Sequence, residues 1–271
     1  MNEPAPVPSF PTSLGTSEAT SIRLLGQDLA ADLMGRVGFG ELAFWLVAQR
    51  RPTSSEVRVF EAVLVALADH GFTPTAIAAR LTYLSAPESL QGAVAAGLLG
   101  CGSVVLGASE SAGRFLAEIA QRRGRSGDMR AAALHVLREY RAQRRPIPGY
   151  GHPLHRGADP RALRLLEVAA EAGVAGLHID IARQVEALLP EVLNRALTLN
   201  VSGAIPAVLL DVGYPLAALK GVPLLARTAG LIAHLLEEQQ RAIGFVMSHA
   251  AAQAIGYDGD APPGFKPSED A

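Results

Sequence analysis

Apolar residues recur at helical spacing along most of the chain. From Ile22 onward they return every three or four positions, which is the period of one face of an α-helix. No run alternates between apolar and polar residues over the length of a strand, and no βαβ rhythm or internal repeat accompanies the helical pattern. The pattern therefore predicts an all-α fold.

Prolines, glycines and small hydroxyl residues divide this pattern into separate helices. The hydroxyl residues at 53–55, after Pro52, can cap a helix start, and Pro74 begins a further helix. The basic run RRGR at 122–125 predicts a break between two helices. The expected helices cover roughly 42–47, 57–69, 74 onward, 112–121, 128–143, 160–173, 180–199 and 224–255, the last as one long helix or two.

The two ends of the chain and one internal segment have the composition of loops. Residues 1–20 are rich in proline, serine and threonine and are expected to form a flexible arm. Residues 144–159 hold three prolines and three glycines in sixteen positions, which predicts a loop. The tail from Gly256 is again rich in proline, glycine and acidic residues.

Composition narrows the class of protein. The 271 residues are 49% hydrophobic and 18% charged with a formal net charge of −2, so the chain can bury a full core and lacks the basic face that nucleic acid requires. Lysine occurs only at Lys220 and Lys266, and arginine supplies the other basic residues. This bias suits an enzyme that binds small acids, but the codon usage of a GC-rich genome explains it equally well.

Several observations favour a soluble cytoplasmic protein. Cys101 is the single cysteine, so no intrachain disulfide can form, and its apolar, glycine-rich surroundings predict a packed small residue. The N-terminus lacks a basic region followed by an apolar segment. The uncharged stretch 89–109 holds five glycines and no aromatic or basic membrane anchors, which favours a small-residue helix packed between other helices.

Polar, reactive side chains gather at three places, of which ADHG at 68–71 is the first. It follows an apolar helix, and His70 can hydrogen-bond an anionic ligand while Asp69 fixes its tautomer. A plain helix end, where histidine is electrostatically favoured and Gly71 stops the helix, explains the same residues. From spacing alone, the plain helix end is the favoured interpretation.

The second place is PGYGHPLHR at 148–156, followed by DPR at 159–161. Its glycines let backbone amides approach a ligand, His152 can donate to a carbonyl or carboxylate, and Arg156 can bind a carboxylate through two N–H groups. Asp159 and Pro160 are typical of a helix cap and its first turn. A surface turn does not explain two histidines beside arginines, so this segment predicts a ligand site.

The third place is RTAG at 227–230, with His234 about two turns further on the same helix face. Arg227 can reach a buried carboxylate, although a surface arginine and a packing histidine are the plainer alternatives. Glu237 and Arg241, four residues apart, are expected to form a surface ion pair. Scattered histidines and a single cysteine argue against a metal site, and no serine-hydrolase or dinucleotide motif follows a strand.

Together, ADHG (68–71), PGYGHPLHRGADPR (148–161) and ARTAGLIAH (226–234) resemble the citrate synthase superfamily. The middle motif is the most specific, and the resemblance covers roughly residues 22–260. The short chain, the absence of an acidic residue after His70 and the ending YDGDAPPGFKP are similar to citryl-CoA lyases and to the citrate-synthase-like module of ATP-citrate lyase.

The resemblance implies a citrate-synthase-like architecture and its ligands. The chain is expected to form a large helical domain (21–113 and 222–271) and a small one (114–221), with the active site in the cleft between them. It is expected to assemble as a homodimer or higher homo-oligomer. The implied ligands are a small carboxylate and a coenzyme A thioester as substrate, with no metal, nucleic acid or membrane.

The resemblance also implies roles for individual residues. His70 and His152 match histidines that bind oxaloacetate or citrate, and His152 also polarises the reacting carbonyl. Arg156 and Arg227 match arginines that hold carboxylates. The backbone that matches a CoA-contacting loop is that of Ile147, Pro148, Gly149, Tyr150 and Gly151.

The implied reaction is cleavage of citryl-CoA to acetyl-CoA and oxaloacetate. NVSG (200–203) places Ser202 where the family carries its catalytic aspartate, and a hydroxyl alone cannot act as a carboxylate base at neutral pH. Three hypotheses follow: a lyase with its base elsewhere or with substrate-assisted chemistry, an enzyme for a different acyl-CoA and 2-oxo acid, and a catalytically impaired CoA- and carboxylate-binding module. Asp211 and Glu110 are candidate substitute bases, each with a structural role as the plainer alternative.

Overall fold

Helices dominate the structure, a computed structural model that describes residues 10–102, 104–151 and 159–259. This confirms the predicted all-α class. The chain divides into two compact units, the first formed by Met1–Asp69 and Cys101–Ala229 and the second by His70–Gly100 and Gly230–Ala271. The large and small domains expected from the sequence have other boundaries and stay a prediction.

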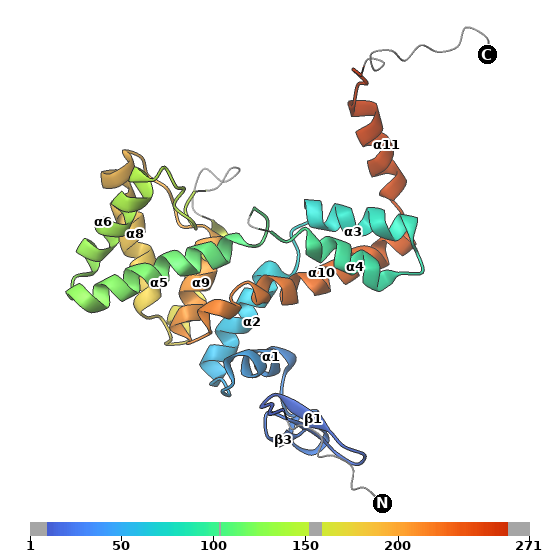
Figure 1. Ribbon diagram of the computed structural model, residues 1–271, viewed down its shortest axis with the longest axis horizontal. Coiled ribbons are helices and arrows are strands. Elements are labelled where there is room, and N and C mark those ends of the chain that lie inside the picture. Colours follow the sequence, from blue (N-terminus) through green and yellow to red (C-terminus); the bar gives the residue numbers. More distant parts are fainter. Residues whose placement is uncertain (1–9, 103, 152–158, 260–271) are drawn as a thin grey trace, which may run out of the picture. The chain divides into compact units, whose positions relative to one another are not determined.

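The first unit holds most of the helices and a small sheet. Its elements are β1 (Gly15–Ser17), β2 (Ile22–Leu24), β3 (Gln27–Asp28), the π-helical turn η1 (Leu29–Leu33), α1 (Phe39–Ala48), α2 (Ser54–Ala68), α5 (Ala108–Ser126), α6 (Met129–Ala142), α7 (Pro160–Glu171), α8 (Leu177–Leu193), α9 (Val201–Asp211) and the 3-10 turn η2 (Leu216–Ala218) (Figure 1). The long helix α10 (Gly221–Gln240) begins in this unit and continues into the second.

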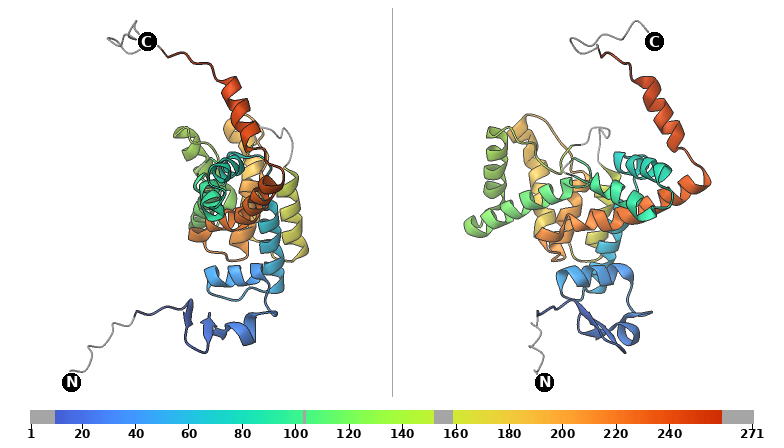
Figure 2. Two further views of the ribbon diagram at one scale, coloured as in Figure 1. Left: turned by 90° about the vertical axis from the view of Figure 1, so that its right-hand side faces the viewer. Right: turned by 45° about the vertical axis from the view of Figure 1, so that its right-hand side comes forward.

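Helix α9 lies at the centre of the first unit. Its neighbours are α5, α7 and α8, and α6 packs in turn on α5 and α8 (Figure 2). Most of its side chains are fully buried, which explains why its sequence is apolar on every face. The rings of Phe44, Phe60 and Tyr214 extend this core toward α1 and α2, with centroids 5.4 to 5.5 Å apart. Helix α9 is thereby enclosed by its neighbours in the first unit.

The second unit consists of α3 (Pro74–Ser85), α4 (Leu90–Leu99), the end of α10 and α11 (Gly244–Ala254). Its core is small: Ala76, Ala79 and Ala93 pack against Leu231 and Leu235 of α10. A Cβ atom on Gly97 would lie 2.8 Å from the Leu231 side chain, so glycine is required there for α4 to approach α10. The predicted small-residue helix within 89–109 is therefore present as α4.

One described stretch, Leu216–Gln240, is long and apolar enough to cross a membrane by length and composition alone. Core helices of soluble proteins share these two properties, and 39% of its most apolar window is buried within the protein.

Helix α5 differs from the sequence-based prediction. The run 122–125 was expected to be a break, but α5 continues through it to Ser126 and ends at Gly127, whose φ of 75° closes the helix. Arg122 pairs with Glu118 at 3.0 Å and with Glu139 at 2.7 Å, and basic residues are favoured at a helix C-terminus. These interactions outweigh the low helix propensity of Gly124.

The three short strands were not predicted, and they correct the expectation of helical structure alone from Ile22 and of a loose arm up to residue 20. They form an antiparallel sheet in the order β1-β2-β3. Leu25 and Gly26 link β2 to β3 with φ values of 53° and 76°, the left-handed geometry of a tight hairpin turn. Strands of two or three residues are too short to give an alternating pattern.

Candidate functional site

The segment 147–151 lies directly against the start of α9. Gly151 N donates to Thr198 O at 2.8 Å, and Asn200 N donates to Gly149 O at 2.9 Å. The Asn200 side chain donates from Nδ2 to Gly151 O at 2.6 Å. Thus the structure brings the predicted CoA-contacting backbone together with the NVSG motif, two segments that are distant in sequence.

Two glycines make this close approach possible. Gly149 has a φ of 88°, and a Cβ atom there would lie 2.7 Å from the Cα of Gly203. A Cβ atom on Gly203 would lie 2.6 Å from the carbonyl oxygen of Gly149. Both distances are shorter than any ordinary van der Waals contact, so the two backbones touch only because neither residue has a side chain.

Tyr150 anchors the same segment. Its ring is buried, and its hydroxyl donates to Ala182 O of α8 at 2.9 Å. Burial, with a further effect of Glu186, holds the pKa of Tyr150 well above its ordinary value, so the hydroxyl stays protonated at neutral pH. This side chain therefore fixes the loop and cannot serve as a base. Ile147 is also buried in the core.

Ser202 lies in the first turn of α9 and is partly buried. Asn200 caps this turn by accepting a hydrogen bond from Gly203 N at 3.2 Å. The N-terminal end of a helix favours negative charge because backbone N–H groups point out of it. Ser202 therefore stands where an anion is electrostatically favoured, beside the 147–151 segment.

Asp159 joins the starts of two helices. It caps α7 by accepting from Arg161 N at 3.0 Å, and it also accepts from Val201 N of α9 at 3.1 Å. The Arg161 guanidinium binds the same carboxylate at 3.0 to 3.1 Å. Burial opposes ionisation of Asp159, but these hydrogen bonds outweigh it and lower the pKa of the carboxyl. The sequence predicted the helix cap but gave no sign of the bond to Val201.

Replacing Asp159 by asparagine is expected to lower the free energy of unfolding at pH 7 by about 1–3 kcal/mol, because Val201 N loses its acceptor. Since the folded-state pKa lies below the unfolded one, the carboxylate stabilises the fold above about pH 4, and this contribution is lost as the pH falls through the folded-state pKa. Urea denaturation of wild type and Asp159→Asn between pH 7 and pH 3 measures the difference, which should shrink in acid. Asp128→Asn, at the exposed cap of α6, is the matched control and should change stability little. A pH-independent difference would contradict this account.

Arg227 is a buried cation with the carboxylate of Asp69 nearby. Its residue exposure is 3%, and its Nη1 atom lies 3.8 Å from Asp69 Oδ1, too far for a hydrogen bond. Among the described residues, Nε and Nη1 have no hydrogen-bond partner. Burial lowers the pKa of Arg227, while Asp69 and Cys101 act in the opposite direction, and a guanidinium remains charged at neutral pH in any case.

A buried guanidinium with two nitrogens that lack a hydrogen-bond partner among the described residues is suited to bind a ligand. Burying a charged group without partners costs several kcal/mol, and most buried polar atoms in folded proteins have partners. A ligand carboxylate could accept from either atom, but the two N–H groups point in different directions, so each needs an acceptor of its own. The carboxylate-binding role of Arg227 stays a prediction.

The other predicted site residues fall into two groups. His152 and Arg156 lie outside the described residues. His70 is described and is exposed, directly after the end of α2. The structure therefore leaves the roles of these three residues as predictions.

Both candidate substitute bases have partners within the fold. Both oxygens of Asp211 accept hydrogen bonds at the start of α8, from the backbone of Gly176, His178 and Ile179 and from His178 Nδ1, at 2.8 to 3.1 Å. Glu110 pairs with Arg114 at 2.9 Å one turn along α5. Asp211 therefore caps the start of α8, and Glu110 forms an ion pair on the surface of α5.

Two further groups can be placed. Burial raises the pKa of the Cys101 thiol, and the neighbouring Arg227 opposes this effect, so the thiol is neutral at pH 7.

The predicted ion pair of Glu237 with Arg241 is wrong, because Glu237 binds Arg80 of α3 instead. In the described ranges, no group of three or more His, Cys, Asp or Glu side chains is arranged to hold a metal ion.

The mostly helical fold agrees with a citrate-synthase-like protein. Residues 16–244 match the profile of the family "Citrate synthase, C-terminal domain", and the chain belongs to this family.

Comparison with individual proteins gives more detail on this family membership. The chain is similar to a citryl-CoA lyase from Hydrogenobacter thermophilus, with a TM-score of 0.84 and 32% identity over 95% of this chain and 97% of that one. It has the fold of an ATP citrate lyase from Methanothrix soehngenii solved with citrate and coenzyme A, with a TM-score of 0.78 and 23% identity over 95% of this chain and 43% of that one. It is 30% identical over 200 residues to the "Putative citrate synthase 2" of Mycobacterium tuberculosis, covering 71% of this chain and 50% of that protein. The chain thus spans about half the length of the curated relatives it matches.

Proposed function

We propose that this protein is a citryl-CoA lyase-like enzyme, which cleaves citryl-CoA to acetyl-CoA and oxaloacetate. The observation that carries the proposal is the buried Arg227 guanidinium, two of whose nitrogens have no hydrogen-bond partner among the described residues. Citryl-CoA carries two free carboxylates and is suited to such a cation. The similarity to a citryl-CoA lyase along nearly the whole of both chains supports the same substrate.

The reaction is a carbon–carbon cleavage next to a thioester. A base takes the proton of the citryl hydroxyl, the adjacent carbon–carbon bond breaks, and the oxygen becomes the keto group of oxaloacetate. The electron pair passes to the thioester as the enolate of acetyl-CoA, which then takes up a proton at carbon. In the proposed site Arg227 holds a carboxylate, and His70 and His152 bind the oxaloacetate portion and donate hydrogen bonds to the developing charge.

Ser202 stands at the position of the family's carboxylate base, so another group must take the proton. Its hydroxyl is uncharged at neutral pH, whereas the family pattern has a carboxylate there. Asp159 is a buried carboxylate bonded to this turn, but it accepts from Val201 N and from Arg161, and its lowered pKa makes it a poor base. We propose that a carboxylate of the substrate itself takes the proton while Arg227 and the histidines hold the substrate in place.

Mass-spectrometric turnover of synthetic citryl-CoA tests this function. Wild type is expected to release acetyl-CoA, and His152→Ala is expected to reduce the rate by about 100-fold or more because it removes a hydrogen-bond donor to the reacting carbonyl. Ser202→Asp restores the family carboxylate and is expected to raise the rate.

The other hypotheses predict different results. Activity that appears only in Ser202→Asp, with CoA binding intact in wild type, would identify a binding module with an impaired active site. Turnover of another acyl-CoA in preference to citryl-CoA would identify a related enzyme with a different substrate pair.

We propose in addition a cytoplasmic homodimer. A CoA-thioester substrate and a chain with one cysteine support the cytoplasm, and the family resemblance supports the dimer. Light scattering coupled to size-exclusion chromatography measures the mass of the assembly, and a mass equal to one chain of 28.3 kDa would contradict the dimer.

A further inference from the structure

Arg80 is the largest fully buried side chain within the described part of the chain, with a residue exposure of 0%. It belongs to α3, where it stands alone among alanine, leucine and other uncharged residues. A guanidinium in such a position must be satisfied by partners from elsewhere in the fold, because an unpaired buried charge is strongly destabilising.

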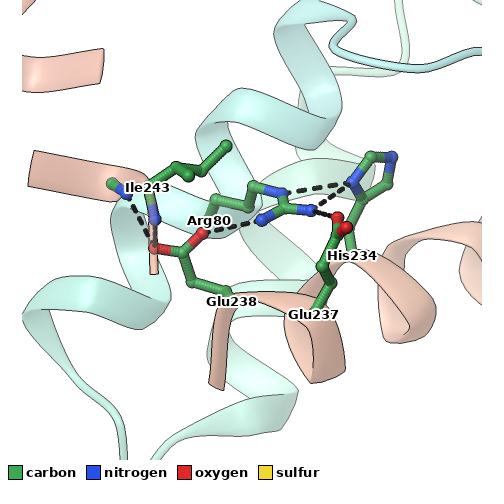
Figure 3. A network of polar contacts seen from close by, with 6 residues as sticks. Arg80, His234, Glu237, Glu238 and Ile243 are labelled. Carbon is green, nitrogen blue, oxygen red and sulfur yellow. Dashed lines mark hydrogen bonds and ion pairs between the residues drawn. The ribbon is translucent and has the colours of Figure 1, made fainter. Parts of the chain in front are cut away.

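Three side chains of α10 supply those partners, as Figure 3 shows. Arg80 Nη1 donates to Glu238 Oε2 at 2.7 Å, and Arg80 Nη2 donates to Glu237. Arg80 Nε and Nη2 lie 3.1 and 3.0 Å from His234 Nδ1. Since the guanidinium can only donate, Nδ1 is the acceptor, and the ring proton of neutral His234 is on Nε2.

Glu238 extends this cluster to the start of α11. Its second oxygen, Oε1, accepts from Ile243 N at 2.9 Å and from Gly244 N at 2.7 Å. One carboxylate therefore joins Arg80 to the first turn of the following helix.

Phe72 extends the cluster in the other direction, toward His70. The Arg80 guanidinium lies over the Phe72 ring, 5.1 Å from its centroid, and the Phe72 and His234 rings meet edge to face with centroids 5.6 Å apart. Phe72 is separated from His70 in the sequence by Gly71, which has a φ of 67°. Thr73 N donates a hydrogen bond to Gly71 O at 2.8 Å and so closes a short turn. The turn that carries His70 is therefore held by a ring that is itself fixed against Arg80.

We propose that Arg80 and Phe72 are positioning residues for His70. This inference rests on the proposed function, in which His70 binds the oxaloacetate portion of the substrate. Phe72 is 54% exposed although it is a large apolar residue, so burial alone does not explain it. Its contact with the cation and with His234 sets the direction in which the short turn presents the imidazole of His70.

The variant that tests the proposal is Phe72→Leu, which keeps an apolar side chain but removes the aromatic face above Arg80. It is expected to raise KM for citryl-CoA about fivefold with little change in kcat, and Phe72→Tyr is expected to restore the wild-type KM. In a His70→Ala background, Phe72→Leu should have no further effect, because the residue through which it acts is gone. Phe245→Leu, an exposed aromatic of α11 outside the cluster, is the matched control and should behave as wild type.

A second readout does not depend on turnover. The imidazole resonances of histidine-labelled protein, with His70 assigned from His70→Ala, report the surroundings of the ring in the ligand-free protein. Phe72→Leu and the milder Arg80→Lys, which keeps the charge but loses the forked donors, are expected to shift the His70 signal, and Phe245→Leu is not. An unchanged His70 signal and an unchanged KM, with only a lower melting temperature, would show that the cluster is merely structural and would overturn the proposal.

The two readouts separate this proposal from the proposed function. If wild type does not cleave citryl-CoA but the His70 signal moves in Phe72→Leu, the function is wrong and the positioning is supported. If wild type cleaves citryl-CoA and neither KM nor the His70 signal changes in Phe72→Leu, the function stands and the positioning is wrong.

Discussion

Replacing Arg227 by methionine is expected to make the folded protein more stable while removing most of its affinity for citrate. The guanidinium is buried, with Nε and Nη1 unpaired within the described part of the chain, so its removal should raise the free energy of unfolding by about 1–3 kcal/mol. Methionine fills a similar volume without a charge. Loss of a charge-assisted contact with a carboxylate should weaken citrate binding by about 100-fold.

Urea denaturation and titration calorimetry with citrate measure the two effects of Arg227→Met. The matched control is Arg164→Met, on the surface of α7, where the ion pairs with Glu167 and Glu171 are exposed. This control should change stability little, because exposed ion pairs contribute little, and it should leave citrate binding unaltered. A less stable Arg227→Met protein that binds citrate normally would show that Arg227 supports the fold instead of holding a ligand.

Replacing Gly149 by alanine is expected to be the most destabilising of the small substitutions. The added methyl group would lie 2.7 Å from the Cα of Gly203, and the φ of 88° is itself unfavourable for alanine. Steric overlap and backbone strain together should cost about 3–5 kcal/mol. Gly203→Ala, which has the overlap but no positive φ, should cost about 2–4 kcal/mol.

Thermal and urea unfolding of the glycine variants measure these costs. Gly124→Ala is the matched control, because Gly124 lies inside α5 and a Cβ atom there meets nothing within 4 Å. Alanine should stabilise α5 by about 0.5–1 kcal/mol through its higher helix propensity. Similar stabilities for Gly149→Ala and Gly124→Ala would mean that the junction between residue 149 and α9 is looser than described.

Helices were predictable where their start signals are local. Thr53 and Glu56 form the reciprocal cap at the start of α2, and Pro74 and Pro160 stand at the first positions of α3 and α7. The end of α8 was predicted six residues too late, because Asn194 adopts a left-handed φ of 56° that its sequence neighbours do not dictate. Local chemistry thus fixes helix starts better than helix ends.

The candidate site was only partly predictable, since its geometry depends on distant contacts. The motif around Gly149 and the NVSG motif were each recognised, but nothing in the sequence shows that Gly149 rests on Gly203. The cluster around Arg80 was missed entirely, because its partners His234 and Glu238 lie 154 and 158 positions away. The only sequence signal was a single arginine within an otherwise uncharged helix.

The contacts at the start of α9 have a consequence for how mutations combine in this fold. Gly151 is bonded to Thr198 and Asn200, and Asp159 is bonded to Val201. Two segments that are separate in the chain thus share one anchor, residues 198–201. A change in this anchor affects both segments at once, so the effects of substitutions in Gly151, Asp159 and the anchor are expected to be coupled instead of additive.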